Sequence, residues 1–388
     1  MNLVEAAARG DLVAVTAQVA QGIDVNTQDA NGRTPLSWAA GSGSEAIVEF
    51  LLSQSGVEPG LADTDGRTPF SWAAGNGCRE VVQQLQRRGI KQDFENAAGR
   101  TPFPWPAGNW HQEDTRILLS SEEPADTQDK NGRTPLSWAA GNGHHLVVED
   151  LLNGKKVRND FADLDNRTPL SWAAGNGHDK VVRALLQIAG TYQYRGARIA
   201  ADSRDSNGRT PLSWAARNGH DNVANILIIQ VDINATDYEG LSPLLQAAKH
   251  GHSAVVECLL SGPDIKLNFA DALGQTALHY AAKSDHIGVV TKLLTRREVS
   301  VDAKDIGGIT PLRKAVQHNA TQSIQSLLQS SASTEGILRD DWLDAFGEPS
   351  SYIVLLSEMP GGIRGINFIA EECLSTALSS SAQKRHLL

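Results

Sequence analysis

Apolar residues along the chain fall into short groups that return at a regular spacing and alternate with polar stretches containing glycine. The first group of each cycle holds a Leu and two Ala, as in Leu36, Ala39 and Ala40, whose spacing places them on one face of a short helix. The second group holds paired Val and paired Leu four residues apart, as at 147–148 and 151–152. The pattern therefore predicts two short helices per cycle, each burying one face against its neighbours.

The residues between these groups predict where each helix starts and ends. Thr34 is suited to cap the first helix, and Pro35 suits the first helical position, where its missing N–H would have no partner anyway. Glycines in the stretch 41–43 end that helix, because glycine adopts the left-handed conformation common at helix C-termini. The turn formers of the stretch 29–32 predict a hairpin between successive helix pairs.

The Thr or Ser that opens the first helix recurs every 32 to 34 residues, apart from one interval of 42. The positions are Thr34, Thr68, Thr101, Thr134, Thr168, Thr210, Ser242, Thr276 and Thr310. Residues 2–27 hold a similar helix pair without the Thr-Pro opening, as expected of an N-terminal capping unit. The sequence thus predicts about ten repeated units over residues 1–330.

The motif Thr-Ala-Leu-His-Tyr-Ala, which begins at Thr276, together with the period near 33 residues, resembles the ankyrin repeat. The resemblance implies an all-α repeat solenoid, a superhelix of helix pairs joined by β-hairpin loops, which binds a protein partner on its concave face. A tetratricopeptide solenoid is the alternative, with a similar period but without the Gly/Asp hairpin. The runs Gly-Arg-Thr-Pro-Leu-Ser-Trp-Ala-Ala-Gly-Asn-Gly-His resemble repeats of ankyrin proteins from filamentous fungi.

Residues 331–388 do not follow the repeat. Stretch 337–346 predicts an amphipathic helix, and stretches 352–356 and 363–369 predict two strands joined by a Pro-Gly-Gly turn. We expect this tail to form a small α/β cap that covers the apolar face of the last repeat.

Two stripes of unusual residues run through the first six full repeats and stop together. An arginine precedes each Thr at Arg33, Arg67, Arg100, Arg133, Arg167 and Arg209, and a tryptophan follows four residues after it at Trp38, Trp72, Trp105, Trp138, Trp172 and Trp214. The resemblance implies that the residue before Thr-Pro projects onto the concave face, so the arginines would form a ladder favouring an acidic partner. Alternatively, each arginine pairs with the Asp five residues before Thr, and each tryptophan fills the gap between successive first helices.

The third full repeat departs most from the pattern. Pro106 falls inside its first helix, where proline removes a backbone hydrogen bond. Trp110 replaces a glycine and joins Trp105 in a proline-aromatic cluster. This cluster is a candidate docking spot, and degeneration of one repeat is the alternative explanation.

The 42-residue interval contains an insertion over 188–198. It holds Tyr192, Tyr194, Arg195 and Arg198, residue types that are enriched at binding hot spots. Insertions in solenoids lie in surface loops, so these four residues are candidate partner contacts. A plain length variation of a tolerant loop explains the insertion equally well.

Composition narrows the classes of protein. Of 388 residues 40% are hydrophobic and 21% charged, which is typical of a folded protein, and the net charge of −10 argues against nucleic acid as a partner. Three cysteines, Cys78, Cys258 and Cys373, are too few and too scattered for a disulfide framework. No apolar stretch approaches the roughly 18 residues of a membrane span, and the first residues do not resemble a secretory signal. We expect a cytoplasmic protein, with the nucleus as an alternative, and leave its oligomeric state open.

A search for catalytic motifs finds no nucleophile elbow, phosphate-binding loop or zinc-protease signature. His144, His178, His220 and His252 occupy one repeated turn position and are interpreted as structural. We therefore expect no catalytic residue, no metal and no cofactor. The predicted function is a non-enzymatic protein-protein interaction scaffold, and the alternative is an enzyme acting on a small molecule through an aromatic-lined groove or the tail.

Overall fold

The computed structural model describes residues 1–90, 126, 128–129, 131–153, 157–188, 200–330 and 332–334. Several predicted features lie outside these residues. They are the tail elements at 337–346, 352–356 and 363–369, and the candidate site residues Arg100, Trp105, Trp110, Tyr192, Tyr194, Arg195 and Arg198.

Eighteen short helices form in the described part of the chain, and they follow one another as nine pairs. We call the first member of each pair the inner helix and the second the outer helix. The inner helices are α1 (Leu3–Ala8), α3 (Pro35–Gly41), α5 (Pro69–Gly75), α8 (Pro135–Gly141), α10 (Pro169–Gly175), α12 (Pro211–Asn218), α14 (Pro243–His250), α16 (Ala277–Lys283) and α18 (Pro311–Gln317). The outer helices are α2 (Leu12–Ala20), α4 (Glu45–Leu52), α6 (Arg79–Arg87), α9 (His145–Asn153), α11 (Asp179–Ile188), α13 (Asp221–Leu227), α15 (Ser253–Leu260), α17 (Ile287–Leu294) and α19 (Thr321–Gln329).

The predicted capping signals act as expected. The Thr134 hydroxyl accepts a hydrogen bond from the Ser137 backbone N–H at 3.2 Å, and Pro135 occupies the first helical position of α8. After the helix, Gly143 has a φ of 79°, in the left-handed region that glycine tolerates best. Residues read from the sequence as helix starts and stops therefore do set the bounds of the inner helices.

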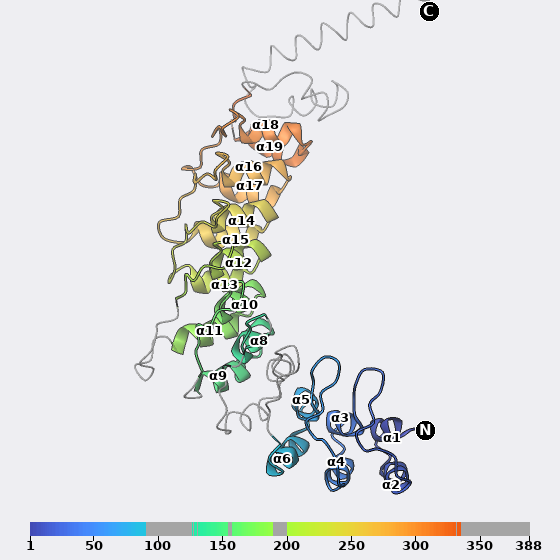
Figure 1. Ribbon diagram of the computed structural model, residues 1–388. Helices are drawn as coiled ribbons and strands as arrows, with labels where there is room; N and C mark the ends of the chain where they lie inside the picture. The colour runs from blue at the N-terminus through green and yellow to red at the C-terminus, as the bar shows by residue number, and fades with distance from the viewer. Residues whose placement is uncertain are drawn as a thin grey trace, which may run out of the picture. The chain divides into compact units, whose positions relative to one another are not determined.

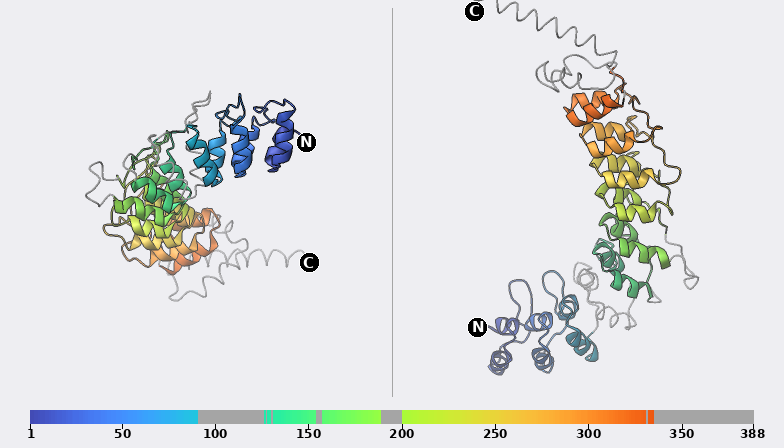
Figure 2. Two further views of the ribbon diagram at one scale, coloured as in Figure 1. Left: turned by 90° about the horizontal axis from the view of Figure 1, so that it is seen from below. Right: turned by 180° about the vertical axis from the view of Figure 1, so that it is seen from behind.

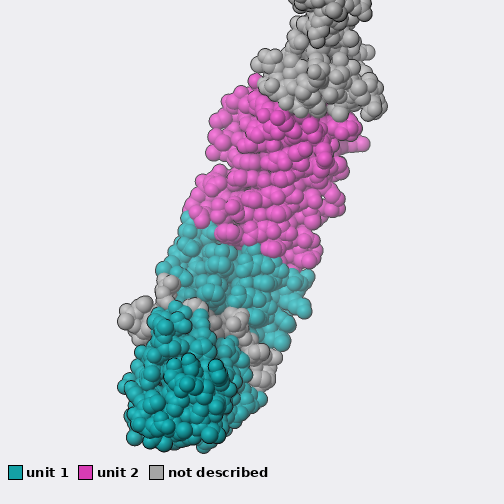
Figure 3. Space-filling model, turned by 90° about the vertical axis from the view of Figure 1, so that its right-hand side faces the viewer, with its two compact units in different colours: residues 1–206 teal, residues 207–388 magenta. Residues whose placement is uncertain are grey.

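The chain divides into two compact units, residues 1–206 and 207–388 (Figure 3). Within unit 2, each inner helix contacts the inner helix of the next pair, from α12 through α14 and α16 to α18. The outer helices α13, α15, α17 and α19 contact one another in the same order, so the pairs stack as successive layers (Figures 1 and 2). In unit 1, the same contacts join α1, α3 and α5, and join α8 to α10.

The core of each layer consists of the apolar stripes that the sequence pattern predicts. In unit 2, Leu212, Ala215 and Ala216 of α12 are fully buried, as are Val255 and Val256 of α15. The small alanines let the inner helices approach closely, and the larger Val and Leu side chains of the outer helices fill the space between layers. No single layer could bury these stripes alone.

Backbone hydrogen bonds join the hairpins of adjacent repeats. The Tyr238 N–H donates to the Asn207 carbonyl at 3.0 Å, and the Ile306 N–H donates to the Leu273 carbonyl at the same distance. Among the described residues the hairpins contain no strand, and one isolated antiparallel bridge forms between Ala270 and Thr276.

A second set of links lies on the loops that follow the outer helices. The Asn268 amide donates to the Glu298 carbonyl at 2.7 Å and accepts from the Ser300 N–H at 2.7 Å. Asn234 makes the same pair of bonds to the Asp264 carbonyl and the Lys266 N–H, each at 2.9 Å. Each of these amides therefore fixes the register between its own repeat and the next.

Candidate functional site

One aspartate organises each hairpin where it meets the inner helix. In the repeat of α10, one carboxylate oxygen of Asp163 accepts hydrogen bonds from the backbone N–H groups of Asp165 at 3.0 Å and Arg167 at 2.8 Å. The other oxygen accepts from the indole N–H of Trp172 at 2.8 Å. The carboxylate thus closes the turn and ties it to the helix nine residues later.

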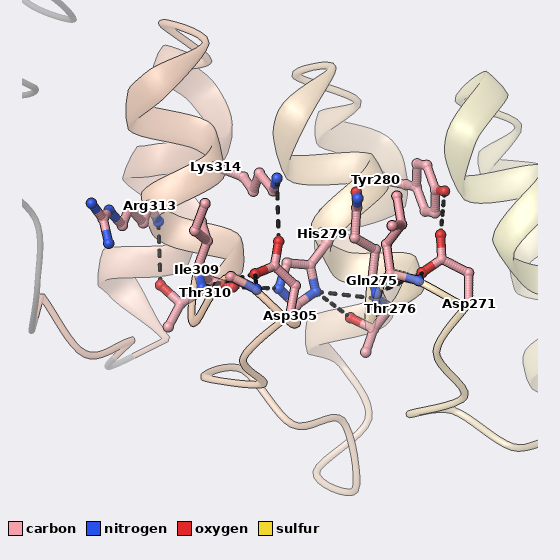
Figure 4. A network of polar contacts seen from close by, with 12 residues as sticks. Asp271, Gln275, Thr276, His279, Tyr280, Asp305, Ile309, Thr310, Arg313 and Lys314 are labelled. Atoms are coloured by element: carbon pink, nitrogen blue, oxygen red, sulfur yellow. Dashed lines mark hydrogen bonds and ion pairs between the residues drawn. The ribbon is translucent and has the colours of Figure 1, made fainter.

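The same arrangement recurs in both units with a changing donor. The bonds run from Trp38 to Asp29 (2.9 Å), Trp72 to Asp63 (2.9 Å), Trp138 to Asp129 (3.1 Å), Gln246 to Asp237 (2.7 Å) and Tyr280 to Asp271 (2.6 Å), and the ammonium of Lys314 lies 3.3 Å from Asp305. Figure 4 shows the last two pairs side by side in successive repeats. The position four residues after Thr therefore takes a hydrogen-bond donor in every repeat named here, whatever its shape.

The arginine and tryptophan stripes form one interleaved stack. The guanidinium carbon of Arg33 lies 3.5 Å from the ring centre of Trp38 in its own repeat and 3.7 Å from that of Trp72 in the next. Arg133 lies in the same way between Trp138 at 3.7 Å and Trp172 at 3.9 Å. We call this arrangement the Arg–Trp stack. It accounts for the parallel course of the two stripes, since each of these arginines contacts the indole of its own repeat and that of the next.

Burial changes the electrostatics of the stack. Arg133 is 9% exposed, and burial lowers its pKa to about 10, although the nearby carboxylates of Asp129 and Asp163 oppose this shift. Its Nη2 donates to the Ser137 carbonyl at 3.1 Å, while its Nε is buried without a hydrogen-bond partner. Burial likewise lowers the pKa of Arg33. The flat faces of both guanidinium groups contact indoles, and Arg133 in particular presents little surface to a partner.

The glycines that end the inner helices α3 and α8 make room for the stack. A Cβ atom on Gly141 would lie 2.9 Å from Nη2 of Arg133, and one on Gly41 would lie 3.3 Å from Nη2 of Arg33. In unit 2 this position carries Arg217, Lys249 and Lys283 in turn. There the stack is already loosened, because the guanidinium of Arg209 lies 5.2 Å from Trp214 and 3.7 Å from the carboxylate of Asp237 in the next repeat.

The histidines at the repeated turn have the structural role predicted for them. The Nε2 atom of His178 lies 3.0 Å from the Gly141 carbonyl, and that of His252 lies 2.9 Å from the Arg217 carbonyl. Each imidazole thus bonds to the end of the preceding inner helix. The structure describes no group of three or more His, Cys, Asp or Glu side chains that could hold a metal ion.

Large apolar side chains project from the hairpin tips. Tyr238, Leu273 and Ile306 of unit 2 are 75%, 51% and 76% exposed, and Leu164 of unit 1 is 75% exposed. The sequence analysis did not single out these residues. Their apolar side chains within a turn stretch could have identified them in the sequence, because residues at such turns are usually polar.

Models of the family described as "Ankyrin repeats (3 copies)" match residues 3–96, 72–160, 107–194, 155–237, 191–269 and 244–336. The chain belongs to the ankyrin-repeat family. A search of curated proteins found no match. The predicted fold class, an all-α ankyrin solenoid, is therefore confirmed, while the predicted α/β cap lies outside the described residues.

Ankyrin repeats are in general protein-protein interaction modules, which agrees with the coarse function predicted from the sequence. None of the described helices of this ankyrin array is long and apolar enough to cross a membrane.

The structure places the candidate residues Arg33, Arg67, Arg133, Arg167 and Arg209 beside the indoles of their own repeats. It brings arginine to tryptophan and tryptophan to aspartate, whereas the sequence analysis paired arginine with the aspartate of the same hairpin. Contact of these arginines with a partner stays a prediction.

Proposed function

We propose that this ankyrin-repeat chain is a non-enzymatic protein-protein interaction scaffold that binds a partner through the face formed by its inner helices and hairpins. The row of exposed hairpin residues Tyr238, Leu273 and Ile306 carries the proposal. Isolated exposed apolar side chains are ordinary on protein surfaces, but three on neighbouring hairpins of one unit form a continuing apolar row, which is a feature of interaction sites.

The hairpins themselves do not require these apolar side chains. The N–H that follows the organising aspartate donates to the neighbouring hairpin from Thr64 and Ser206 just as it does from Leu164 and Ile306. A polar residue therefore supports the same backbone bond. The apolar character of the row in unit 2 is better explained by contact with a partner.

A triple variant tests this role. We expect Tyr238→Ser, Leu273→Ser and Ile306→Ser together to leave the helical circular dichroism unchanged and to abolish capture of the protein that the wild-type chain retains from a cell extract. Ile229→Ser is the matched control, because Ile229 is 74% exposed but follows the outer helix α13. A partner retained equally by the triple variant and the wild type would refute the proposed face.

The arginines of the Arg–Trp stack remain candidate contacts within this proposal. A partner lying across the inner helices of unit 1 would pass over Arg167 and over Arg133, of which Arg133 is 9% exposed. Replacing both with Met would keep the apolar stem of each side chain while removing its charge. We expect weaker binding of an acidic partner, with a loss that shrinks as salt is raised.

A further inference from the structure

Three inner helices of unit 2, α12, α14 and α16, carry a cation in the last turn, at the position where α3, α5, α8 and α10 of unit 1 have glycine. Arg217, Lys249 and Lys283 each stand seven residues after the helix-opening Thr or Ser, in the last turn of α12, α14 and α16. We call these three residues the basic row. A cation in the last turn interacts favourably with the helix dipole, so the fold accommodates these side chains. Their direction and surroundings point to a further role.

Two members of the basic row extend over the next repeat. Nη1 of Arg217 lies 3.5 Å from the Gln246 side-chain oxygen, and Nζ of Lys249 lies 5.7 Å from the ring centre of Tyr280. Both contacts are with the donor four residues after Thr or Ser in the following repeat. Two of the three cations are therefore each in contact with the following repeat.

The third member meets a different neighbour. The residue that corresponds to Gln246 and Tyr280 in the last repeat is Lys314, which pairs with the buried carboxylate of Asp305 at 3.3 Å. Two lysines repel one another, so this position offers no attraction to Lys283. Lys283 is exposed and, within the part of the chain that the structure describes, makes no ion pair.

The carboxylate of Glu239 forms an ion pair with Lys249 of the basic row. Glu239, on a hairpin of unit 2, lies 3.8 Å from Arg209 and 4.0 Å from Lys249. Its side chain is 63% exposed, and ion pairs at such exposure are weak and easily exchanged. An incoming carboxylate could therefore take its place.

The other carboxylates near this face are directed elsewhere. Asp237 and Asp271 accept hydrogen bonds from Gln246 and Tyr280 of their own repeats. Asp285 accepts the Ser323 backbone N–H at 2.7 Å. Among the carboxylates named here, Glu239 alone pairs with a member of the basic row.

We infer that the basic row of unit 2 binds an extended acidic segment of a protein partner, with carboxylates at every third residue. The inference rests on the proposed function and adds the chemistry of the partner. Packed helices lie about 8–10 Å apart, and an extended chain in the polyproline II conformation rises about 3.1 Å per residue with three residues per turn, so every third side chain points to the same face and meets the next inner helix. Carboxylates with this spacing reach Arg217, Lys249 and Lys283 in turn.

Synthetic peptides test the charge and the spacing separately. The probe is a fluorescein-labelled 12-residue peptide with Glu at every third position and Ser elsewhere, and fluorescence anisotropy with the full chain measures its binding. One comparison peptide has Gln in place of Glu, and a second has the same composition with all Glu at one end. We expect the Gln peptide not to bind and the clustered peptide to bind about fivefold more weakly. Equal affinity of the spaced and clustered peptides would overturn the assigned spacing.

Variants of the chain change the affinity in opposite directions. We expect Lys283→Glu to lower the affinity for the spaced peptide at least about fivefold. Glu239→Gln should raise that affinity, because it removes the carboxylate that competes for Lys249. Lys266→Glu is the control, since it reverses an exposed charge on the loop after α15. The gain with Glu239→Gln cannot arise from misfolding. Unchanged affinity in both variants, or an equal loss with Lys266→Glu, would overturn the inference.

The two proposals fail in different ways. If the hairpin triple variant still captures the partner, the hairpin row is not the binding face, whatever the peptides do. If the triple variant loses the partner while Lys283→Glu binds the spaced peptide as the wild type does, the proposed face stands and only the inference of an acidic segment is wrong.

Discussion

At the scale of single residues, the carboxylate of Asp163 determines the geometry of its hairpin. It is buried and accepts three hydrogen bonds, of which only the one from Trp172 comes from a side chain. We expect Trp172→Phe to keep an aromatic face for Arg133 and to lower the free energy of unfolding by about 1–3 kcal/mol, because a buried carboxylate loses a donor. Urea denaturation followed by circular dichroism measures the change. The loss should shrink when Asp163 is also replaced by Asn, and an equal loss in that background would contradict the assigned bond.

The titration of the buried His279 should affect the stability of the fold. Its Nδ1 lies 2.9 Å from the Thr276 hydroxyl and its Nε2 lies 2.9 Å from the Ile309 carbonyl (Figure 4), and burial lowers its pKa. The folded state then holds a neutral imidazole, whereas the unfolded chain takes up a proton as pH falls through about 6.5. Stability is thus fully present above that pH and is lost as pH falls towards the lower pKa of the folded state.

Serine is the natural replacement for His279, because α8, α10 and α12 use serine at the same place. We expect His279→Ser to lower the urea midpoint at pH 7, since the bond to Ile309 is lost. The decrease of the urea midpoint between pH 7 and pH 5 should be smaller in this variant than in the wild type. A variant whose midpoint still falls by the wild-type amount would show that another group, such as His250, is responsible.

At the scale of the elements, the links between repeats are as informative as the helices. Asn268 uses both ends of its amide to hold the backbone of the next repeat. We expect Asn268→Ala to cost about 1–2 kcal/mol and to speed hydrogen exchange at the Ser300 amide, which loses its acceptor. Asn222→Ala, at an exposed position of α13, is the control and should change neither quantity. Unchanged protection of Ser300 would count against the link.

The helices and their bounds were predictable from the sequence because their signals are local. A capping Thr, a proline at the first position and a glycine at the end lie within one short stretch, as in α8. The side-chain pairing was harder, because arginine contacts the tryptophan of the next repeat and sequence spacing alone favoured its own aspartate. The replacement of tryptophan by Gln246, Tyr280 and Lys314, all donors, was the available clue.

The hairpin tips and the basic row were beyond prediction for another reason. Whether Ile306 or Lys283 is exposed depends on what the neighbouring repeat places beside it, and the sequence pattern of one repeat does not contain that information. The repeat pattern does not predict the chemistry of the partner either, because one helical framework is compatible with many different surface residues.

At the scale of the whole molecule, each repeat is stabilised chiefly by its neighbours, so the end of the array is its weak point. We propose that residues 331–388 cover the last repeat, as expected from the sequence. Removing residues 337–388 should then lower both the thermal midpoint and the solubility of the chain, because the apolar face of a terminal repeat would meet water. Differential scanning calorimetry of the two chains measures this effect, and an unchanged midpoint would contradict the capping role.

The Arg–Trp stack also determines what an optical experiment can observe. The chain has eight tryptophans, and none lies between residues 215 and 334, where Gln246, Tyr280 and Lys314 replace them. Indole emission therefore reports mainly on the earlier repeats, because the last three helix pairs contain no indole of their own and Trp342 alone follows them in the sequence. Circular dichroism weighs all helices alike. If the two units melt separately, the fluorescence and dichroism curves will not coincide, because most of the indoles lie in unit 1.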